Sequence, residues 1–504
     1  MIAPTLDTRQ TTPVACLPAL LVEILRHIDG PSILQCSSVC RTLNRAIDSS
    51  AELQYHIELA LDCVLDGPPS TVTVSECLEQ LRTLRSAWTL FEWKKEVRVP
   101  MPDFCHAYEL VGGGGIDHNQ SCSRRFISSW LPPSSAPGHT LVRNAIGIST
   151  GDFTIDPSQD LIAFHPEASS PILRTLTPSI MTSAFIQIVD DVIGMFWMEL
   201  DNPRITIWNW KTGQILVVRS QRRRLATHIS YFSFILNRAY MITRGIDGGS
   251  IQVFTFGENQ HEIVHVASLS LPVLKSRHFV HCAIHTGHFV ARCPPNTPFW
   301  TNQEERMYVL SVDYIQMDPH IPGARPKFFL FFKNSTPLRY IRKYREQRET
   351  TPFEVPWEEW GPHESRMLHH QVPYQWLRYV HGHRVVFPLQ SSSTQVMDFN
   401  VRKTKRHVFP PQPDSKARVE VIDYPTIISS DGLFPGLIET NLPYRICRRD
   451  ELEGFSGVMI DEQRFVGLKS PSFADGDMKD LHVLTAVERC TLLFCCRSQD
   501  KCYS

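Results

Sequence analysis

A change in hydrophobic spacing near residue 97 constrains the fold of this chain more than any other feature. Before this point, apolar residues recur every three or four positions, which is the spacing of a helix face. After it, short apolar runs alternate with Gly, Pro, Asn and Asp, as in strands joined by turns. The sequence therefore predicts a multidomain α+β chain: a small helical module, a connecting helix, and a large mainly-β domain.

The helical module is predicted to contain three short helices. The first begins near Pro18 and ends at Asp29-Gly30, and its apolar face holds Leu20, Leu21, Ile24, Leu25 and Ile28. Pro31 suits the first turn of the second helix, and the apolar positions of the third run from Val39 to Ile47. A longer helix between Ser75 and Trp93 connects this module to the rest of the chain.

The β region begins near Val97 and contains one further candidate helix, at 337–349. The clearest strands are Phe185–Met198, Arg204–Trp210, Gln214–Arg219, Ile229–Leu236, Ala239–Thr243 and Ser250–Phe256. Lys211-Thr212-Gly213 joins two of them as a short hairpin connection. This succession of antiparallel strands resembles the blades of a β-propeller, although the spacing does not give the number of blades.

Composition excludes several partner classes. The 504 residues include 51 Lys+Arg and 52 Asp+Glu, so the net charge of −1 predicts no bulk attraction to nucleic acid or to a membrane. The sequence shows no signal peptide and no apolar run of about 18 residues, which predicts a cytoplasmic and/or nuclear protein. The irregular spacing of the 14 cysteines predicts free thiols.

Residues 17–47 resemble the F-box. The resemblance rests on Leu17-Pro18 at the start, Ile24-Leu25 in the first helix, and Val39-Cys40-Arg41 at the opening of the third. It implies that the module docks on a Skp-type adaptor, which links it to a cullin-based ubiquitin ligase, while the rest of the chain selects the substrate. The adaptor-binding positions that it implies are Leu17, Pro18, Leu21, Ile24, Leu25, Ile33, Leu34, Val39 and Cys40.

One departure and one alternative accompany this resemblance. Leu43-Asn44 stands where many F-boxes have a Trp followed by an apolar residue, which weakens the case for the third helix as part of the interface. The alternative is that 17–47 is only a helical cap on the β region, with its Leu and Ile side chains forming ordinary core. The ordered set of F-box residues favours the F-box interpretation over this alternative.

The resemblance extends to a group of F-box proteins from mushroom-forming fungi. Four stretches carry it: 152–164, 205–217, 355–368, and 442–447 followed by 458–469. In that group the region after the F-box is similar to a WD-repeat-type propeller. The resulting division is a flexible N-terminus (1–14), an F-box (15–62), a linker with the connecting helix (63–96), a β-propeller-like substrate-binding domain (97–490), and a C-terminal strand and tail (491–504).

We found no set of residues that predicts catalysis, and we expect no metal or cofactor. Gly112 to Gly115 lacks the Lys-Ser/Thr of a phosphate-binding loop and is predicted to be a turn. Two groups could supply metal ligands but lack the spacing of a metal site, so we predict strand and tail residues instead. These groups are Cys490, Cys495, Cys496 and Cys502 with His482, and His381 with His383, which have His369 and His370 upstream.

The segment 325–348 is the one local charge anomaly, since it has eight basic residues and one acid. Arg342, Lys343 and Arg345 are therefore weak candidates for contact with an acidic or phosphorylated substrate. The alternative, which we favour, is a solvated insertion whose aromatic residues pack on the propeller. We assign Trp208, Trp210, Trp357 and Trp360 to packing between blades, with a turn at Trp357–Gly361.

The sequence thus predicts a non-catalytic substrate receptor that acts by proximity, with the connecting helix setting the distance and angle between adaptor and substrate. Two alternatives stay open. One is an adaptor-bound scaffold without a ligase role. The other is a propeller-type hydrolase or lectin-like binder with a helical cap.

Overall fold

The structure is a computed structural model of the whole chain. It describes the following residues: 17–69, 71–93, 95–100, 114–117, 126–130, 140–143, 150–159, 161–166, 181–199, 202–220, 229–246, 248–258, 262–275, 278–290, 292–293, 298–316, 326–369, 378–388, 394–401, 417–429, 433–449, 455, 457–469 and 480–486.

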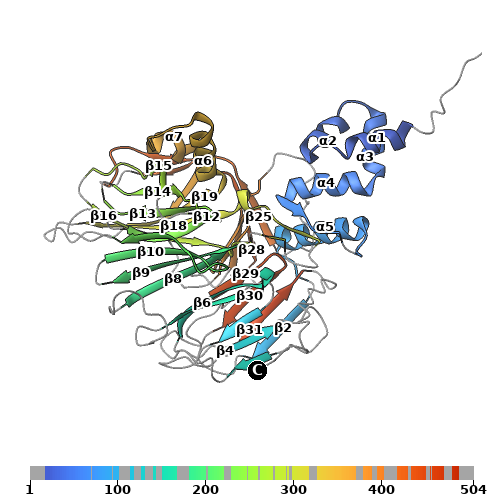
Figure 1. Cartoon of the computed structure of the whole chain (residues 1–504). Helices are drawn as coiled ribbons and strands as arrows, with labels where there is room; N and C mark the ends of the chain where they lie inside the picture. The colour runs from blue at the N-terminus through green and yellow to red at the C-terminus, as the bar shows by residue number, and fades with distance from the viewer. Residues whose placement is uncertain are drawn as a thin grey trace, which may run out of the picture.

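The helical module contains four helices, one more than the sequence predicts. They are α1 (Leu17–Leu25), α2 (Gly30–Ser37), α3 (Arg41–Ser49) and α4 (Ala51–Asp62), and they form the blue group in Figure 1. The three predicted helices are confirmed, but α1 ends at Leu25 and Asp29 caps the next helix, accepting a hydrogen bond from the Ser32 N–H at 3.0 Å.

The connecting helix is confirmed as α5 (Val74–Leu90). A capping box fixes its start, because the Thr73 hydroxyl accepts from the Glu76 N–H while the Glu76 carboxylate accepts from the Thr73 N–H. Phe91, at a φ of 52°, ends it. The short strand β1 (Val64–Asp66), between α4 and α5, pairs antiparallel with β17 (Phe299–Thr301), which belongs to the β region.

The strands after α5 pair mainly in chain order into antiparallel sheets. The early sheets are β3 (Gly114–Asp117), β4 (Phe126–Trp130) and β5 (Thr140–Arg143); β6 (Thr150–Asp156) and β7 (Leu161–Pro166); and β8 (Met181–Val189), β9 (Val192–Glu199), β10 (Asn202–Asn209) and β11 (Ile215–Ser220). Next comes the sheet of β12 (Ile229–Leu236), β13 (Ala239–Arg244), β14 (Ser250–Thr255) and β15 (Val264–Ser270), to which β20 (Phe353–Val355) adds in parallel.

The later sheets follow the same scheme with some rearrangement. One holds β16 (His278–Thr286), β18 (Met307–Gln316), β19 (Lys327–Lys333) and β21 (Ser365–His369). The next has the order β22 (Val380–His381), β23 (Arg384–Pro388), β24 (Thr394–Asp398), β28 (Tyr444–Arg449) and β25 (Ala417–Ile422). A two-stranded ribbon joins β26 (Thr426–Ile428) to β27 (Ile438–Thr440).

The last sheet joins the two ends of the β region. It consists of β29 (Gly457–Ile460), β30 (Arg464–Lys469) and β31 (Asp480–Thr485), completed by β2 (Lys95–Pro100), which directly follows the helices in sequence and pairs antiparallel with β31. Figure 1 shows the sheets fanned out beside one another, with the helical module projecting from the fan.

Five of the six predicted strands are confirmed with boundaries shifted by no more than two residues, but Phe185–Met198 is wrong as a single strand. It is the hairpin of β8 and β9, which turns at Asp190-Asp191 with Asp190 at a φ of 54°. An Asp can adopt this left-handed conformation at small energetic cost, so two residues suffice for the turn. The apolar pattern continues on both sides and hides the break.

Two other local predictions need correction, and a third is confirmed. Trp357–Gly361 is not a turn but the start of α7 (Trp357–Glu364), because its indole rings pack inward and Pro356 precedes its first residue. The glycine run is not wholly a turn, since Gly114 and Gly115 begin β3, while 112 and 113 lie outside the described residues. The candidate helix at 337–349 is confirmed as α6 (Ser335–Gln347).

Of the four tryptophans assigned to packing, the two on α7 are the most deeply buried. Trp360 is fully buried, Trp357 is nearly so, and the Trp360 indole N–H donates to the Ser270 carbonyl at 2.9 Å. Trp208 and Trp210 are only partly buried. Among the helices of the described residues, none has the combination of length and apolar composition that crossing a lipid bilayer requires.

Candidate docking site on the helical module

All four helices contribute to the core of the helical module. Leu25 and Ile33, two of the predicted adaptor-binding residues, lie inside this core together with Ile47, Leu53, Ile57 and Leu61. Three of these six side chains come from α4, which the sequence analysis missed. Leu25 and Ile33 are therefore core residues of the module, and their role in adaptor binding stays a prediction.

Other predicted positions are left open to solvent. Ile24 is 63% exposed, Val39 is 72% exposed, and Cys40 is also exposed. Leu20, one turn before Ile24 on α1, is 59% exposed and was not among the predicted docking residues. Its i, i+4 spacing with Ile24 is the sequence signal that could have identified it.

The remaining candidates fall between these groups. Leu21 and Leu34 are half-buried, and Leu34 packs against the module's core. Leu17 and Pro18 belong to α1, but their side chains lie outside the part of the chain that the structure describes. We define the exposed docking face as Leu20, Ile24 and Val39, since these are large apolar side chains that the module leaves uncovered.

Gly30 allows α2 to pack closely on α4. A Cβ atom at this position would lie 2.7 Å from both the Ala60 Cβ and the His56 carbonyl oxygen, which is closer than real contacts allow. Asp29-Gly30 therefore does more than separate two helices: Asp29 caps α2 and Gly30 lets its first turn approach α4.

Polar contacts fasten α4 and β1 to the β region. The Tyr55 hydroxyl lies 3.0 Å from both the Asp66 carboxylate and the Pro298 carbonyl. The Asn400 amide donates to the Leu61 carbonyl at 2.7 Å, and its oxygen accepts from the Cys63 thiol at 3.3 Å. Because the two Asn400 bonds are buried, the last turn of α4 is held directly by the β region.

A buried ion-pair cluster locks α4 to α5. The Arg85 guanidinium donates to both Asp62 carboxylate oxygens, at 2.6 and 2.8 Å, and lies 2.6 Å from Glu58. Burial raises the pKa of Asp62, whereas for Glu58 the opposing effect of burial is outweighed by Arg85 and Arg82, which lower its pKa. The bidentate geometry orients the two helices relative to one another.

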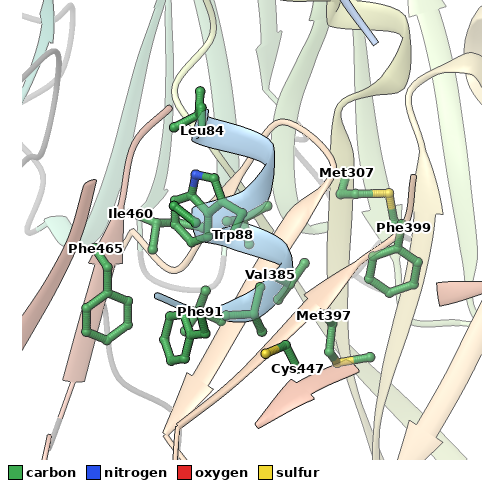
Figure 2. Close-up of a cluster of buried hydrophobic side chains, with 14 of the residues drawn as sticks. Leu84, Trp88, Phe91, Met307, Val385, Met397, Phe399, Cys447, Ile460 and Phe465 are labelled. Atoms are coloured by element: carbon green, nitrogen blue, oxygen red, sulfur yellow. The ribbon is translucent and has the colours of Figure 1, made fainter. Parts of the chain in front are cut away.

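The C-terminal half of α5 is part of the core of the β region. Leu84, Trp88 and Phe91 pack in one cluster with side chains from strands far away in sequence, as Figure 2 shows. These partners include Met307, Val385, Met397, Phe399, Cys447, Ile460 and Phe465. Trp88 is only 2% exposed. The predicted connecting helix is therefore an integral element of the large domain as well as a connector.

A polar cluster around Glu462 surrounds the indole of Trp88. The Trp88 indole N–H donates to the Glu462 carbonyl at 3.0 Å. The Arg384 guanidinium lies 5.0 Å from the centre of the Trp88 ring. The Glu462 carboxylate bonds to His381, at 2.9 Å, and to the Thr301 hydroxyl. Burial opposes ionisation of Glu462, but these contacts and Arg384 outweigh it and hold its pKa well below the usual range.

The two histidines of the H-x-H pattern do not share a strand face. Gly382, at a φ of 54°, makes the turn between them, so His381 ends β22 and His383 precedes β23. The His381 side chain is 16% exposed, whereas His383 is buried. His383 is fully buried 3.5 Å from Asp398, and burial lowers its pKa to about 4, so it is neutral near pH 7.

The other metal candidates do not assemble in the described residues. His482, on β31, lies 2.8 Å from the Glu96 carboxylate on β2, and His369 ends β21. His370, Cys490, Cys495, Cys496 and Cys502 lie outside the described residues. Within the part that is described, no three His, Cys, Asp or Glu side chains gather closely enough to hold a metal ion.

The basic candidates lie on the exposed side of α6. Arg342 forms an ion pair with Glu304, and the Lys343 ammonium lies 4.7 Å from the centre of the Phe353 ring. Arg345 is exposed in the last turn, and Tyr340 is buried on the opposite side. The aromatic residues of this segment thus pack on the β region, as the favoured alternative predicts.

Comparison with known proteins identifies the helical module. The F-box domain family matches residues 15–54, which span α1 to α3 and the start of α4. The chain carries an F-box domain. No curated protein matches the sequence of the chain.

Solved structures with some similarity include two WD40 domains. The WD40 domain of coronin from Toxoplasma gondii is 7% identical, with a TM-score of 0.36 over 78% of this chain and 87% of that one. The WD40 domain of SCAP from fission yeast is 8% identical, with a TM-score of 0.27 over 78% of this chain and 99% of that one.

Proposed function

We propose that this protein is the substrate-receptor subunit of a Skp/cullin/F-box-type ubiquitin ligase. The observation that carries the proposal is the F-box domain at 15–54, whose helices leave Leu20, Ile24 and Val39 exposed. A small module cannot bury all of its apolar surface, and a partner's groove is the usual place for the remainder. The partner is a Skp-type adaptor and, through it, a cullin.

We further propose that residues 97–490 form a closed β-propeller that recruits the protein substrate. Pairing of β2 with β31 supports closure, because it completes the last sheet with a strand from the start of the region. The first strands of successive sheets also neighbour one another, as β8, β12, β16, β22 and β29 do in that order. Under this proposal the folded domains are flanked by a flexible N-terminus (1–14) and a C-terminal strand and tail (491–504). The joint between the F-box and the propeller is the linker 63–96.

The proposed mechanism is proximity without chemistry on this chain. The bonds of α4, β1 and α5 to the β region fix where the F-box stands relative to the propeller. A fixed separation raises the effective concentration of substrate lysines near a ubiquitin-loaded enzyme elsewhere in the complex. The protein would act in the cytoplasm or nucleus, where cullin ligases operate.

Co-purification of the full chain with a Skp-type adaptor tests the proposal. We expect the native chain to bind and the Ile24→Asp/Val39→Asp variant to lose binding, because docking would bury two carboxylates in an apolar interface. Both side chains are exposed, so the variant should fold. Ile427→Asp is the matched control, since Ile427 is 60% exposed on β26, away from the F-box.

The outcomes are distinct. Loss of binding in the double variant alone supports the receptor role. A native chain that fails to bind any adaptor, or a double variant that binds as well as the native chain, would contradict it. The assignment of Arg342, Lys343 and Arg345 to substrate contact stays a prediction.

A further inference from the structure

Two segments, β1 and α5, join the F-box to the β region. Both contact the sheet of β29, β30, β31 and β2 through the turn between β29 and β30, where Glu462 lies. Since β2 follows α5 in the chain and pairs with β31, the F-box is attached at the sheet that joins the two ends of the β region.

The connection through β1 reaches Glu462 by way of β17. The two strands pair antiparallel, and the bond from the Gly67 N–H to the Pro298 carbonyl, at 2.9 Å, continues this pairing. Thr301, the last residue of β17, donates its hydroxyl hydrogen to the Glu462 carboxylate. The paired strands β1 and β17 can therefore move together away from the turn only if this bond breaks.

The connection through α5 reaches the same residue. The Trp88 indole N–H donates to the Glu462 carbonyl at 3.0 Å. The Arg384 guanidinium lies 5.0 Å from the centre of the Trp88 ring and 3.6 Å from the Glu462 carboxylate. The charge of Arg384 also opposes the rise that burial causes in the pKa of Asp62 on α4. Glu462 and Arg384 thus link both helices to the turn between β29 and β30.

The surroundings of the Glu462 carboxylate hold it in one position. One oxygen accepts from Thr301 and lies 2.9 Å from the His381 imidazole, while the other faces Arg384. Only 20% of the Glu462 side chain is exposed. Hydrogen bonds to a charged group stabilise more than neutral ones do, and breaking them leaves a partly buried charge without partners.

We propose that Glu462 is a positioning residue that links the two connections, so that β1 and α5 hold the F-box in a single orientation relative to the β region. Without its carboxylate we expect β1 and β17 to open locally and the orientation to vary, since domains with few fixed contacts move relative to one another. The consequence for ubiquitin transfer rests on the proposed function. The tests themselves need neither adaptor nor substrate.

Hydrogen exchange of the full chain, followed by mass spectrometry, tests the β1 connection. In Glu462→Ala the peptides that contain the N–H groups of Gly67 and Asn302, whose bonds continue the β1–β17 pairing, should exchange about tenfold faster or more. Thr301→Val should have a similar effect in the native chain and no further effect in Glu462→Ala, because both changes remove the same bond.

A distance measurement tests the orientation. Spin labels at Arg45 on α3 and at Ile427 on β26, both exposed, report on the F-box and the β region. They are attached through unnatural amino acids, because the chain has 14 cysteines of its own. We expect a single narrow distance distribution for the native chain and a broader one for Glu462→Ala and Thr301→Val.

Asp191→Ala is the matched control in both experiments. Asp191 lies in the turn between β8 and β9, is 17% exposed, and pairs with Arg238 at 2.6 Å, but it has no contact with β1 or α5 among the described residues. Its loss should leave the exchange of β1 and β17 and the distance distribution unchanged. Far-ultraviolet circular dichroism verifies folding, and Thr301→Val, which removes a single hydroxyl group, serves if Glu462→Ala does not fold.

Two results would overturn the proposal. The first is native exchange in β1 and β17 after Glu462→Ala, or a Thr301→Val effect that is as large in Glu462→Ala as in the native chain. The second is a distance distribution that stays as narrow in Glu462→Ala as in Asp191→Ala. If both tests succeed while the native chain binds no adaptor, the positioning role stands and the proposed receptor function fails.

Discussion

The exposed docking face of the F-box and the buried face of α5 use similar apolar side chains in opposite ways. On α1 the module leaves Leu20 and Ile24 uncovered, although each is large and apolar. On α5 and at its C-cap, Leu84, Trp88 and Phe91 are buried in a core that they share with five or more strands of the β region. The difference supports the proposed division of roles, in which α5 fixes the F-box in place and α1 and the α2–α3 turn bind the partner.

The largest effect on stability is expected from truncating the joint. Trp88→Ala leaves a cavity in the shared core and removes the indole N–H bond to Glu462, so it should destabilise the chain by about 3–5 kcal/mol. Urea unfolding followed by fluorescence measures the loss. If Trp88→Ala and Ile24→Asp destabilised the chain equally, the proposed distinction between joint and docking face would fail.

Acid should weaken the β region through His383. Its buried imidazole has a pKa of about 4, whereas the unfolded chain binds a proton near pH 6.5. Since the unfolded state takes up the proton first, stability is full above pH 6.5 and falls as the pH drops towards 4. Between pH 6.5 and 5 the native chain should lose about 2 kcal/mol more than His383→Gln, in urea titrations at both pH values. Parallel losses in both chains would refute this assignment.

A smaller effect is expected at the start of α5. Thr73→Ala removes the capping bond to the Glu76 N–H and should lower stability by about 1 kcal/mol. Thr71→Ala, two residues earlier and outside the helix cap, is the matched control. Equal unfolding midpoints for the two variants would show that the cap contributes nothing to the joint.

Much of the helical part could be predicted from sequence, because its helices have clear periodicity and strong terminal signals. Asp29, Gly30 and Pro31 mark a real boundary, and Thr73 and Glu76 mark another. Helix α4 was missed because Ala51–Asp62 is buried on several sides and lacks a single apolar face. Ile24 is exposed and Leu25 is buried because of tertiary packing. The F-box pattern contains no information on this packing, so it placed both residues among the adaptor-binding positions.

The β region was less predictable, because its pairing is non-local. The contact of Trp88 with Glu462, and the pairing of β2 with β31, join segments nearly 400 residues apart. Local sequence patterns predict where strands such as β12 lie in the chain, but they do not predict which strands pair with them. The sequence predicted a turn at Trp357–Gly361, whereas these residues begin a short helix.

The smallest effect is expected on α6. Reversing the charges of Arg342, Lys343 and Arg345 breaks an exposed ion pair and one exposed cation–π contact, so the unfolding midpoint should barely change. Capture of substrate from a cell extract measures their functional role. Unchanged capture would remove these residues from the substrate-binding surface.

The most direct test measures adaptor affinity and thermal unfolding on the same preparations of three chains: the native chain, Ile24→Asp/Val39→Asp and Trp88→Ala. A purified Skp-type adaptor is titrated into each chain below its unfolding temperature. We predict at least about a hundredfold loss of affinity with an unchanged unfolding midpoint for the double variant. For Trp88→Ala we predict a lowered midpoint with unchanged affinity. Native affinity in the double variant would contradict the account.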